Sequence, residues 1–123
     1  MLSHNEILGH FLPENLLEYF EIKQIDLLGE VSTQSMFYNI YLDEINTVPL
    51  GYESQEYESK GFSSSSVIQD FPIRGKGVYL HIRKRRWRHK QRKNEIIQND
   101  YSFVSAGSKF TLELAAFLKD TGR

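Results

Sequence analysis

The sequence predicts an α+β fold with an N-terminal helix, a small antiparallel sheet with a protruding basic hairpin, and a short C-terminal helix. Three patterns predict it. Apolar residues recur every three or four positions over residues 7–20, as on one face of a helix. Runs of strand-favouring residues follow, separated by strong turn signals. A second helical stripe, made of Leu114, Phe117 and Leu118, comes near the end. The 123 residues suit a single domain, residues 1–123.

The N-terminal apolar stripe is interrupted by Pro13. Proline fits the first turn of a helix better than its middle, where it lacks a donor and clashes with the preceding turn. We therefore predict a short turn over residues 7–12 and a helix over residues 13–20. Ser3 or Asn5 is the expected cap of the first piece. This apolar face is predicted to serve as core or as a docking surface.

Five segments read as strands because β-branched and aromatic residues concentrate in them. They are residues 22–28, 36–42, 67–71, 78–87 and 100–105. The first two are expected to pair as an antiparallel hairpin. Between the second and the third, residues 43–61 are acidic and contain Pro49 and Gly51, so we predict a loop there.

The long strand over residues 78–87 follows a turn marked by Pro72, Gly75 and Gly77. Alternation along a strand places Val78, Leu80 and Ile82 on one face, and Tyr79, His81, Arg83, Arg85 and Trp87 on the other. After the last predicted strand, a helix is expected over residues 110–118, with Ser108 or Thr111 as its cap.

Charge is distributed very unevenly along the chain, although the net charge is only −1. Residues 1–73 hold two basic residues against twelve acidic ones, and residues 74–123 hold thirteen basic against four acidic. Ten of the fifteen Lys and Arg residues lie between Arg74 and Lys93. Such a split indicates an interaction surface. The alternative is that the two halves simply neutralise each other, but ten cations in twenty residues exceed what nearby carboxylates are expected to pair.

The segment from Arg83 to Arg88 holds five cations and one tryptophan at the end of a predicted strand. Cations fall on both faces there, so we predict an exposed arm that is buried on neither side. A two-stranded ribbon of this kind can enter a major groove or straddle phosphates, and the arginine fork suits both tasks. Trp87 is predicted either to contact the nucleic acid or to anchor the arm by packing. The predicted nucleic-acid-binding residues are Arg74, Lys76, Arg83, Lys84, Arg85, Arg86, Trp87, Arg88, Lys90, Arg92 and Lys93.

The sequence contains no pattern typical of a metal site or a catalytic centre. His81 and His89 have no carboxylate or thiol cluster at ligand spacing, and the chain lacks cysteine. No nucleophile elbow or phosphate-binding loop is present. No apolar run approaches the roughly 20 residues of a membrane span, and residues 1–10 lack the pattern of a signal peptide. We expect a cytoplasmic protein without catalytic residues, cofactor, metal or membrane partner.

Two nearly consecutive segments, residues 69–76 (QDFPIRGK) and 78–87 (VYLHIRKRRW), carry a resemblance to a known family. They resemble the N-terminal region protein of a group of bacterial insertion-sequence transposases. The resemblance extends over residues 12–20, 40–44, 58–62 and 110–123. It covers most of the chain, and the stretch from Asp70 to Trp87 is the more specific part.

The same stretch resembles the zinc-finger module that opens a broader transposase family. In that module a turn after Asp-x-Pro leads into an apolar strand ending in Arg-Arg-aromatic, and cysteine pairs flank the hairpin. This chain has no cysteine. The resemblance therefore implies a hairpin kept without its metal, with Tyr101, Phe103 and the aromatic core replacing the stabilisation that the metal supplies.

The resemblance implies a role in recognising the terminal inverted repeats of a mobile element, with double-stranded DNA as partner. Recombination in this family uses a catalytic domain with three carboxylates and two metal ions, for which 123 residues leave no room. Strand cleavage would then belong to a separate catalytic transposase chain. Two other functions remain open from the residues alone. One is an RNA-binding module, which would prefer single-stranded or A-form substrates, and the other is a protein-interaction subunit whose basic arm binds an acidic partner.

Overall fold

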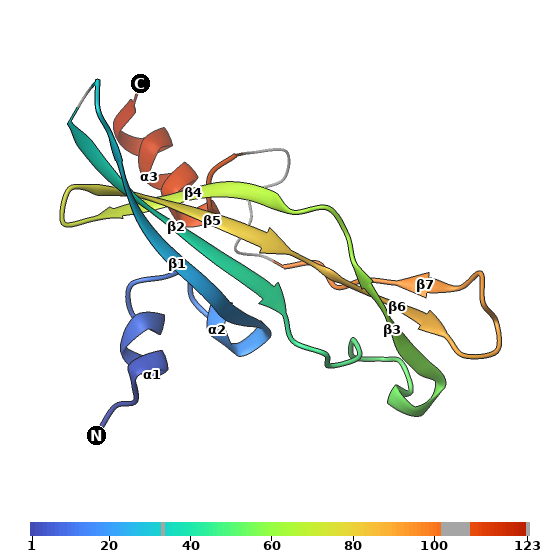
Figure 1. Cartoon of the computed structure of the whole chain (residues 1–123). Coiled ribbons are helices and arrows are strands. Elements are labelled where there is room, and N and C mark those ends of the chain that lie inside the picture. Colours follow the sequence, from blue (N-terminus) through green and yellow to red (C-terminus); the bar gives the residue numbers. More distant parts are fainter. Residues whose placement is uncertain (33, 102–108, 123) are drawn as a thin grey trace.

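The structure, a computed structural model, describes residues 1–32, 34–101 and 109–122. It has the predicted α+β architecture, but its strands form two sheets that lie end to end (Figure 1). The first sheet has the order β1-β2-β5-β4 and the second has the order β3-β6-β7. The strands are β1 (Phe20–Glu30), β2 (Ser35–Glu44), β3 (Tyr57–Phe62), β4 (Ser66–Ile73), β5 (Lys76–Arg83), β6 (Arg85–His89) and β7 (Ile96–Ile97).

The N-terminal segment forms two short helices, α1 (His4–Gly9) and α2 (Leu16–Tyr19). Ser3, one of the two predicted caps, caps α1 in a capping box with Glu6, so the first piece is a helix that begins at His4 and not the turn predicted over residues 7–12. The helix predicted over residues 13–20 is shorter in the structure. It cannot begin at Pro13 because Asn15 has a left-handed backbone conformation, with φ at 68°. It ends where Phe20 pairs with Glu44 in the first sheet.

The first sheet confirms the predicted antiparallel hairpin of β1 and β2, but a wholly antiparallel sheet was the wrong prediction. Strand β5 pairs with β2 in parallel, with Ile40 opposite Leu80. The chain leaves β2, builds β3 in the second sheet, returns as the edge strand β4 and turns back into β5. Hairpin signals specify only strands that follow one another in the chain, so they do not reveal this crossover.

The main core lies on one face of the first sheet. It contains Val78, Leu80 and Ile82 of β5, as their alternation predicts. It also contains Leu12, Leu16, Phe20, Ile40, Leu42 and Ile68. Tyr79, His81 and Arg83 are not buried, in agreement with their predicted place on the opposite face. Arg85 and Trp87 do not continue that face as predicted, because they belong to β6 of the second sheet, where Trp87 is buried. Burial of apolar surface on this one face stabilises the sheet and leaves the other face open.

Near the C-terminal end, residues 109–111 add a short stretch beside β4, with Phe110 opposite Gln69. Helix α3 (Leu112–Gly122) follows, two residues later than predicted. Thr111 is its cap: the hydroxyl accepts from Leu114 N at 3.3 Å and donates to the buried Asp70 carboxylate at 2.9 Å. A strand is predicted over residues 100–105, but residues 100 and 101 are not in a strand. Residues 102–105, which include Phe103, lie outside the described residues, and so does the other predicted cap, Ser108.

The second sheet corrects the loop predicted over residues 43–61. Asp43 and Glu44 belong to β2, and residues 57–61 belong to β3, preceded by the short helix η1 (Ser54–Glu56). An acidic stretch is a poor strand candidate in isolation because its charges repel. Here Glu58 lies opposite Arg88 of β6, so the acidic charge is compensated across the ladder.

Candidate nucleic-acid interface

The ten cations between Arg74 and Lys93 do not form one surface. Arg74 lies in the turn between β4 and β5 with φ at 53°, followed by Gly75 at 77°, and Lys76 begins β5. The eight residues of β5 place this turn about 25 Å from Arg83, at roughly 3.3 Å per residue. In Figure 1 the turn and the β6–β7 hairpin lie at opposite ends of the molecule. The prediction that the cations from Arg74 to Lys93 form one interaction surface is therefore wrong for Arg74 and Lys76.

The long strand predicted over residues 78–87 is interrupted at Lys84, where β5 ends and β6 begins. The carbonyl of Lys84 accepts from Ser63 N at 2.8 Å and from the Ser63 hydroxyl at 3.1 Å. Ser63 itself lies between β3 and β4. These bonds join the two connections between the sheets, so the strand changes sheet here and does not continue as a free arm. The Lys84 ammonium pairs with Asp100 at 3.5 Å.

Arg83 and Arg85 connect the two sheets. The Arg83 guanidinium donates to both oxygens of Asp43 at 2.7 Å, and this contact lowers the pKa of the Asp43 carboxyl. Arg85 donates from its guanidinium to the carbonyl of Glu44 at 3.2 Å and to Ser59 Oγ at 2.7 Å. Both guanidinium groups lie over the ring of Phe62, at 4.4 and 4.5 Å from its centroid. Arg83 and Arg85 thus stabilise the junction between the two sheets. The predicted exposed arm would not give them this structural role.

Glu44 is a buried carboxylate that the sequence did not single out. It is 1% exposed and accepts from Arg85 N at 2.8 Å, from Asn99 Nδ2 at 3.0 Å and from the Tyr101 hydroxyl. Three donors compensate the cost of removing the charge from water. The pKa of Tyr101 is raised, mainly because the side chain is partly buried and also because its hydroxyl donates to Glu44. The group thus ties the end of β2 to the start of β6 and to residues 99–101.

Trp87 is completely buried in the second sheet. Its indole Nε1 donates to Asn46 Oδ1 at 2.9 Å, and in the ladder it lies between Ser59 and Ile97. Of the two roles predicted for Trp87, anchoring by packing is the one its position supports, and contact with nucleic acid is not available to it in this structure. The prediction that the arm is buried on neither side is wrong on this face of β6.

His89 shares the buried face with Trp87 and is 3% exposed. Its Nδ1 accepts from the backbone N–H of Gln91 at 3.1 Å and of Arg92 at 2.9 Å. An Nδ1 that accepts two hydrogen bonds carries no proton, so the proton of a neutral ring lies on Nε2. His89 therefore shapes the turn between β6 and β7, a role that sequence reasoning missed because it weighed this residue only as a metal ligand.

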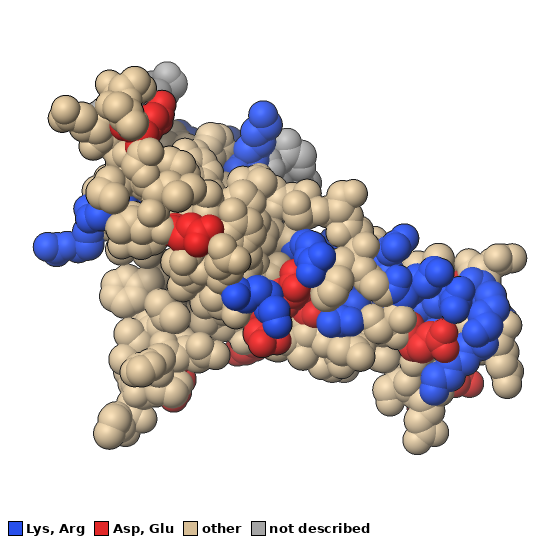
Figure 2. Space-filling view, in the orientation of Figure 1, with Lys and Arg blue, Asp and Glu red and all other residues tan. Residues whose placement is uncertain are grey.

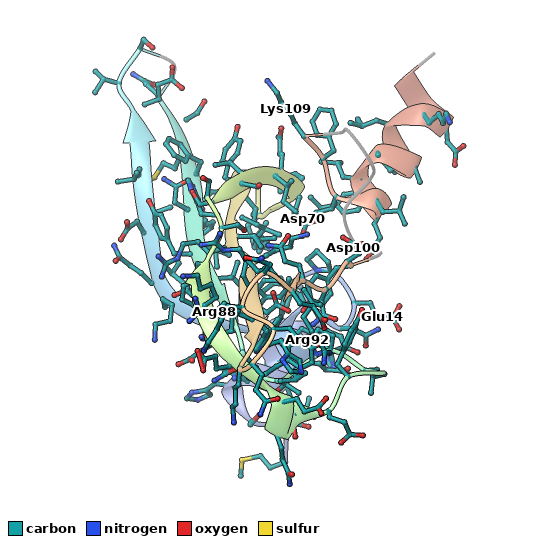
Figure 3. All side chains as sticks on the ribbon, turned by 90° about the vertical axis from the view of Figure 1, so that its right-hand side faces the viewer. Glu14, Asp70, Arg88, Arg92, Asp100 and Lys109 are labelled. Atoms are coloured by element: carbon teal, nitrogen blue, oxygen red, sulfur yellow. The ribbon has the colours of Figure 1, made fainter. Side chains whose placement is uncertain are left out.

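The opposite face of β6 carries the remaining cations. Arg86 and Arg88 alternate with the buried residues, and Lys90, Arg92 and Lys93 follow in the turn before β7. Figure 2 shows Lys and Arg side chains crowded around acidic ones at this end of the molecule. Figure 3 looks onto the same end, where Arg88 and Arg92 are labelled. We call Arg86, Arg88, Lys90, Arg92 and Lys93 the basic end.

Carboxylates partly neutralise the basic end. Glu58 accepts from Arg88 at 3.2 Å and lies 3.9 Å from the Lys93 ammonium, and Glu95 pairs with Arg92 at 2.9 Å. Two hydrogen bonds lower the pKa of Glu95 to about 2: the larger effect comes from Arg92 and the smaller from the Tyr57 hydroxyl. More cations are paired than the sequence predicts, since Arg83 and Lys84 also have carboxylate partners.

Two cations of the basic end differ from the others. In the described part of the chain, the side chains of Arg86 and Lys90 make no hydrogen bond or ion pair, although Arg86 Nε is buried, as is Arg88 Nε. Exposed ion pairs such as Arg88 with Glu58 contribute only about 0–1 kcal/mol. A phosphate can therefore compete with the carboxylates for these cations, whereas Lys90 and the terminal nitrogens of Arg86 have no carboxylate to displace.

Comparison with known proteins finds no match: no family model, no curated protein and no solved structure resembles this chain significantly. Residues 1–32, 34–101 and 109–122 contain no cluster of His, Asp and Glu placed to hold a metal ion. No helix in that part of the chain is both long and apolar enough to cross a membrane.

Proposed function

We propose that this chain binds double-stranded DNA through the basic end of its second sheet, as the part of an insertion-sequence transposition system that recognises the element's terminal repeats. The observation that carries the proposal is the grouping of Arg86 and Lys90, which lack carboxylate partners, with Arg88, Arg92 and Lys93 on one ribbon. The second sheet is narrow, since β7 adds only two residues beside β6. A narrow ribbon can enter a major groove, and cations placed along it can contact phosphates on either side.

In this proposal the cations divide into contacting and supporting groups. Arg86, Lys90 and Lys93 contact phosphates, because their charges are unpaired or only loosely paired. Arg83 and Arg85 hold the second sheet in place through Asp43, Glu44 and Ser59. Strand cleavage is assigned to a separate catalytic transposase chain, and the present chain acts by recognition alone.

The test is a charge-removal variant, Arg86→Ala with Lys90→Ala and Lys93→Ala, compared with Arg74→Ala and Lys76→Ala at the other end of β5. We expect duplex affinity to fall steeply with salt, at a slope near −3 in log–log form if about three phosphates are contacted. The triple variant should lose most of that slope, and the remote double variant should keep it. If both variants lose equal affinity and slope, DNA is attracted by the overall positive charge of the protein and not by a site at the basic end.

The protein-interaction alternative has one observation in its favour, the pairing of Arg88, Arg92 and Lys93 with the chain's own carboxylates. A surface of alternating charge suits a protein partner better than a polyanion. Absence of duplex binding at about 50 mM salt, where phosphate contacts are strong, would favour that alternative.

A further inference from the structure

The face of the first sheet opposite the core presents aromatic and polar side chains to solvent. Parallel pairing of β2 with β5 sets Asn39 opposite Tyr79, Tyr41 opposite His81 and Asp43 opposite Arg83. None of these side chains is buried, whereas the residues between them along both strands, such as Leu42 and Leu80, are completely buried. We call the surface formed by Phe37, Asn39, Tyr41, Tyr79, His81 and Arg83 the open face.

Two aromatic pairs lie on the open face. The rings of Tyr41 and His81 are stacked, with centroids 4.5 Å apart and an interplanar angle of 27°. Phe37 and Tyr79 meet edge to face, with centroids 5.8 Å apart. Gly77 lies beside the second pair, where a Cβ would be at van der Waals distance from both residues. Four half-exposed rings on one sheet face are unusual for a surface that only faces water, where polar residues are expected.

A hollow of about 260 Å³ is lined in part by Tyr41 and His81. Its lining includes Lys23, Gln24, Tyr41, Ser65, His81 and Arg83. Small-molecule sites have volumes of roughly 300–1,000 Å³, so the hollow suits one flat ring with a short polar substituent better than a large cofactor. Its lining combines two aromatic rings, amide and hydroxyl groups for hydrogen bonding, the Arg83–Asp43 ion pair and the Lys23 ammonium.

The electrostatics of the hollow favour a flat ring that carries an anionic group. His81 is held by Asn39 Oδ1 at 2.9 Å, and burial lowers its pKa, so its ring is neutral at pH 7. Asp43 is neutralised by the bidentate Arg83. Lys23 then adds positive charge, weakly shared with Glu21 at 3.7 Å on an exposed surface. Nucleotides offer this combination of a π-face, hydrogen-bonding edges and a phosphate.

We propose that the open face binds unpaired nucleotides of a single-stranded nucleic acid. One base stacks on the Tyr41–His81 pair in the hollow, and its phosphate lies near Lys23. A second base contacts the Phe37–Tyr79 pair further along β2 and β5. This site differs from the basic end, so the chain has one surface for duplex phosphates and another for exposed bases.

The test uses a fluorescently labelled 12-nucleotide oligothymidylate and the matching oligouridylate, with anisotropy as the readout. We expect the Tyr41→Leu variant to bind both oligonucleotides about 5- to 150-fold more weakly than the unsubstituted chain, the range expected for loss of one base–aromatic stack. Tyr41→Phe keeps the ring and should bind normally. Tyr52→Leu removes an exposed tyrosine outside the open face and serves as the matched control.

Thermal unfolding of each variant separates loss of the site from loss of the fold. Because Tyr41 is only half-buried, we expect Tyr41→Leu to keep a folded state at the assay temperature. If that variant proves unfolded, Lys23→Ala gives the second measurement and should weaken binding and reduce its salt dependence. The proposal is overturned if the unsubstituted chain binds neither oligonucleotide, or if folded Tyr41→Leu and Lys23→Ala both bind normally.

The same variants distinguish this proposal from the duplex-binding one. Tyr41→Leu should leave duplex affinity unchanged, whereas the triple variant of the basic end should leave stacking of oligothymidylate in the hollow intact at high salt. Loss of duplex binding alone contradicts the proposed function and not the nucleotide site. If oligothymidylate binding depends on Arg86 and Lys90 but not on Tyr41, the open face is not the site.

Discussion

The two sheets are stabilised by different means. In the first sheet, apolar side chains alternate along the strands and form a continuous core that extends from Leu12 to Ile82. The second sheet has short strands, one of only two residues, and is held by Trp87, by Tyr57 and by hydrogen bonds that converge on Glu44 and His89. Two strands and a fragment are too small to be stable alone. The comparison shows that the basic end depends on a few specific contacts, while the open face depends on bulk packing.

The substitution Trp87→Ala should have the largest effect, because it should destabilise the second sheet much more than the first. Removing a fully buried indole should lower the free energy of unfolding by about 3–5 kcal/mol. Hydrogen exchange should show that amides of β3 and β6 lose protection before those of β2 and β5. Val67→Ala, at a site 48% exposed on the first sheet, should change stability by less than about 0.5 kcal/mol. Uniform loss of protection over both sheets would contradict the separate stabilisation of the second.

The next largest effect is expected from His89→Phe. The variant keeps a flat ring against Tyr57 but removes the acceptor for the amides of Gln91 and Arg92. We expect a cost of about 1–3 kcal/mol and a disordered turn, observed as faster hydrogen exchange over residues 90–95. Since that turn carries Lys90, Arg92 and Lys93, duplex affinity should fall as well. Unchanged hydrogen exchange over these residues would mean that the Arg92–Glu95 pair, and not His89, determines the conformation of the turn.

Arg85→Ala and Arg86→Ala form a matched pair that removes one charge from neighbouring positions. Arg85→Ala loses bonds to Ser59 and to the Glu44 carbonyl, so we expect a cost of about 1–2 kcal/mol in stability. Arg86→Ala should leave stability within about 0.5 kcal/mol and reduce duplex affinity and its salt slope. Denaturant melts and salt titrations of both variants provide the measurement. Equal behaviour of the two would remove the distinction between supporting and contacting arginines.

The smallest effects concern pH, where the two regions should respond with opposite signs. Burial raises the pKa of Asp70 in the first sheet above 3.8, so its ionised form opposes folding and acidification relieves that cost. The pKa of Glu95 near β7 is lowered from 4.5 to about 2, so its contribution is present above pH 4.5 and is lost as the pH falls toward 2.

Two substitutions isolate these contributions. Relative to Asp70→Asn, the unsubstituted chain should gain stability as the pH falls from 7 to 4. Relative to Glu95→Gln, it should lose stability between pH 4.5 and 2. Parallel denaturant melts at each pH give the differences directly. The same sign for both differences would contradict the opposite environments of the two carboxylates.

The sequence by itself determined the local elements. The hairpin of β1 and β2, the inward positions of Val78, Leu80 and Ile82, and the Ser3 cap all follow from short-range patterns, because backbone sterics and alternation act between near neighbours. The clustering of cations in one segment was also visible, since it requires only composition.

Only the tertiary structure decided how that segment is divided. It broke the strand at Lys84, buried Trp87, paired Arg83 with Asp43 and placed Arg74 at the far end of β5. The first three of these outcomes depend on partners about 20 to 40 residues away, namely Ser63, Asn46 and Asp43. A strand's local pattern specifies which side chains share a face but not which strand lies beside it, because that choice depends on how much apolar surface and how many charges the whole arrangement can satisfy.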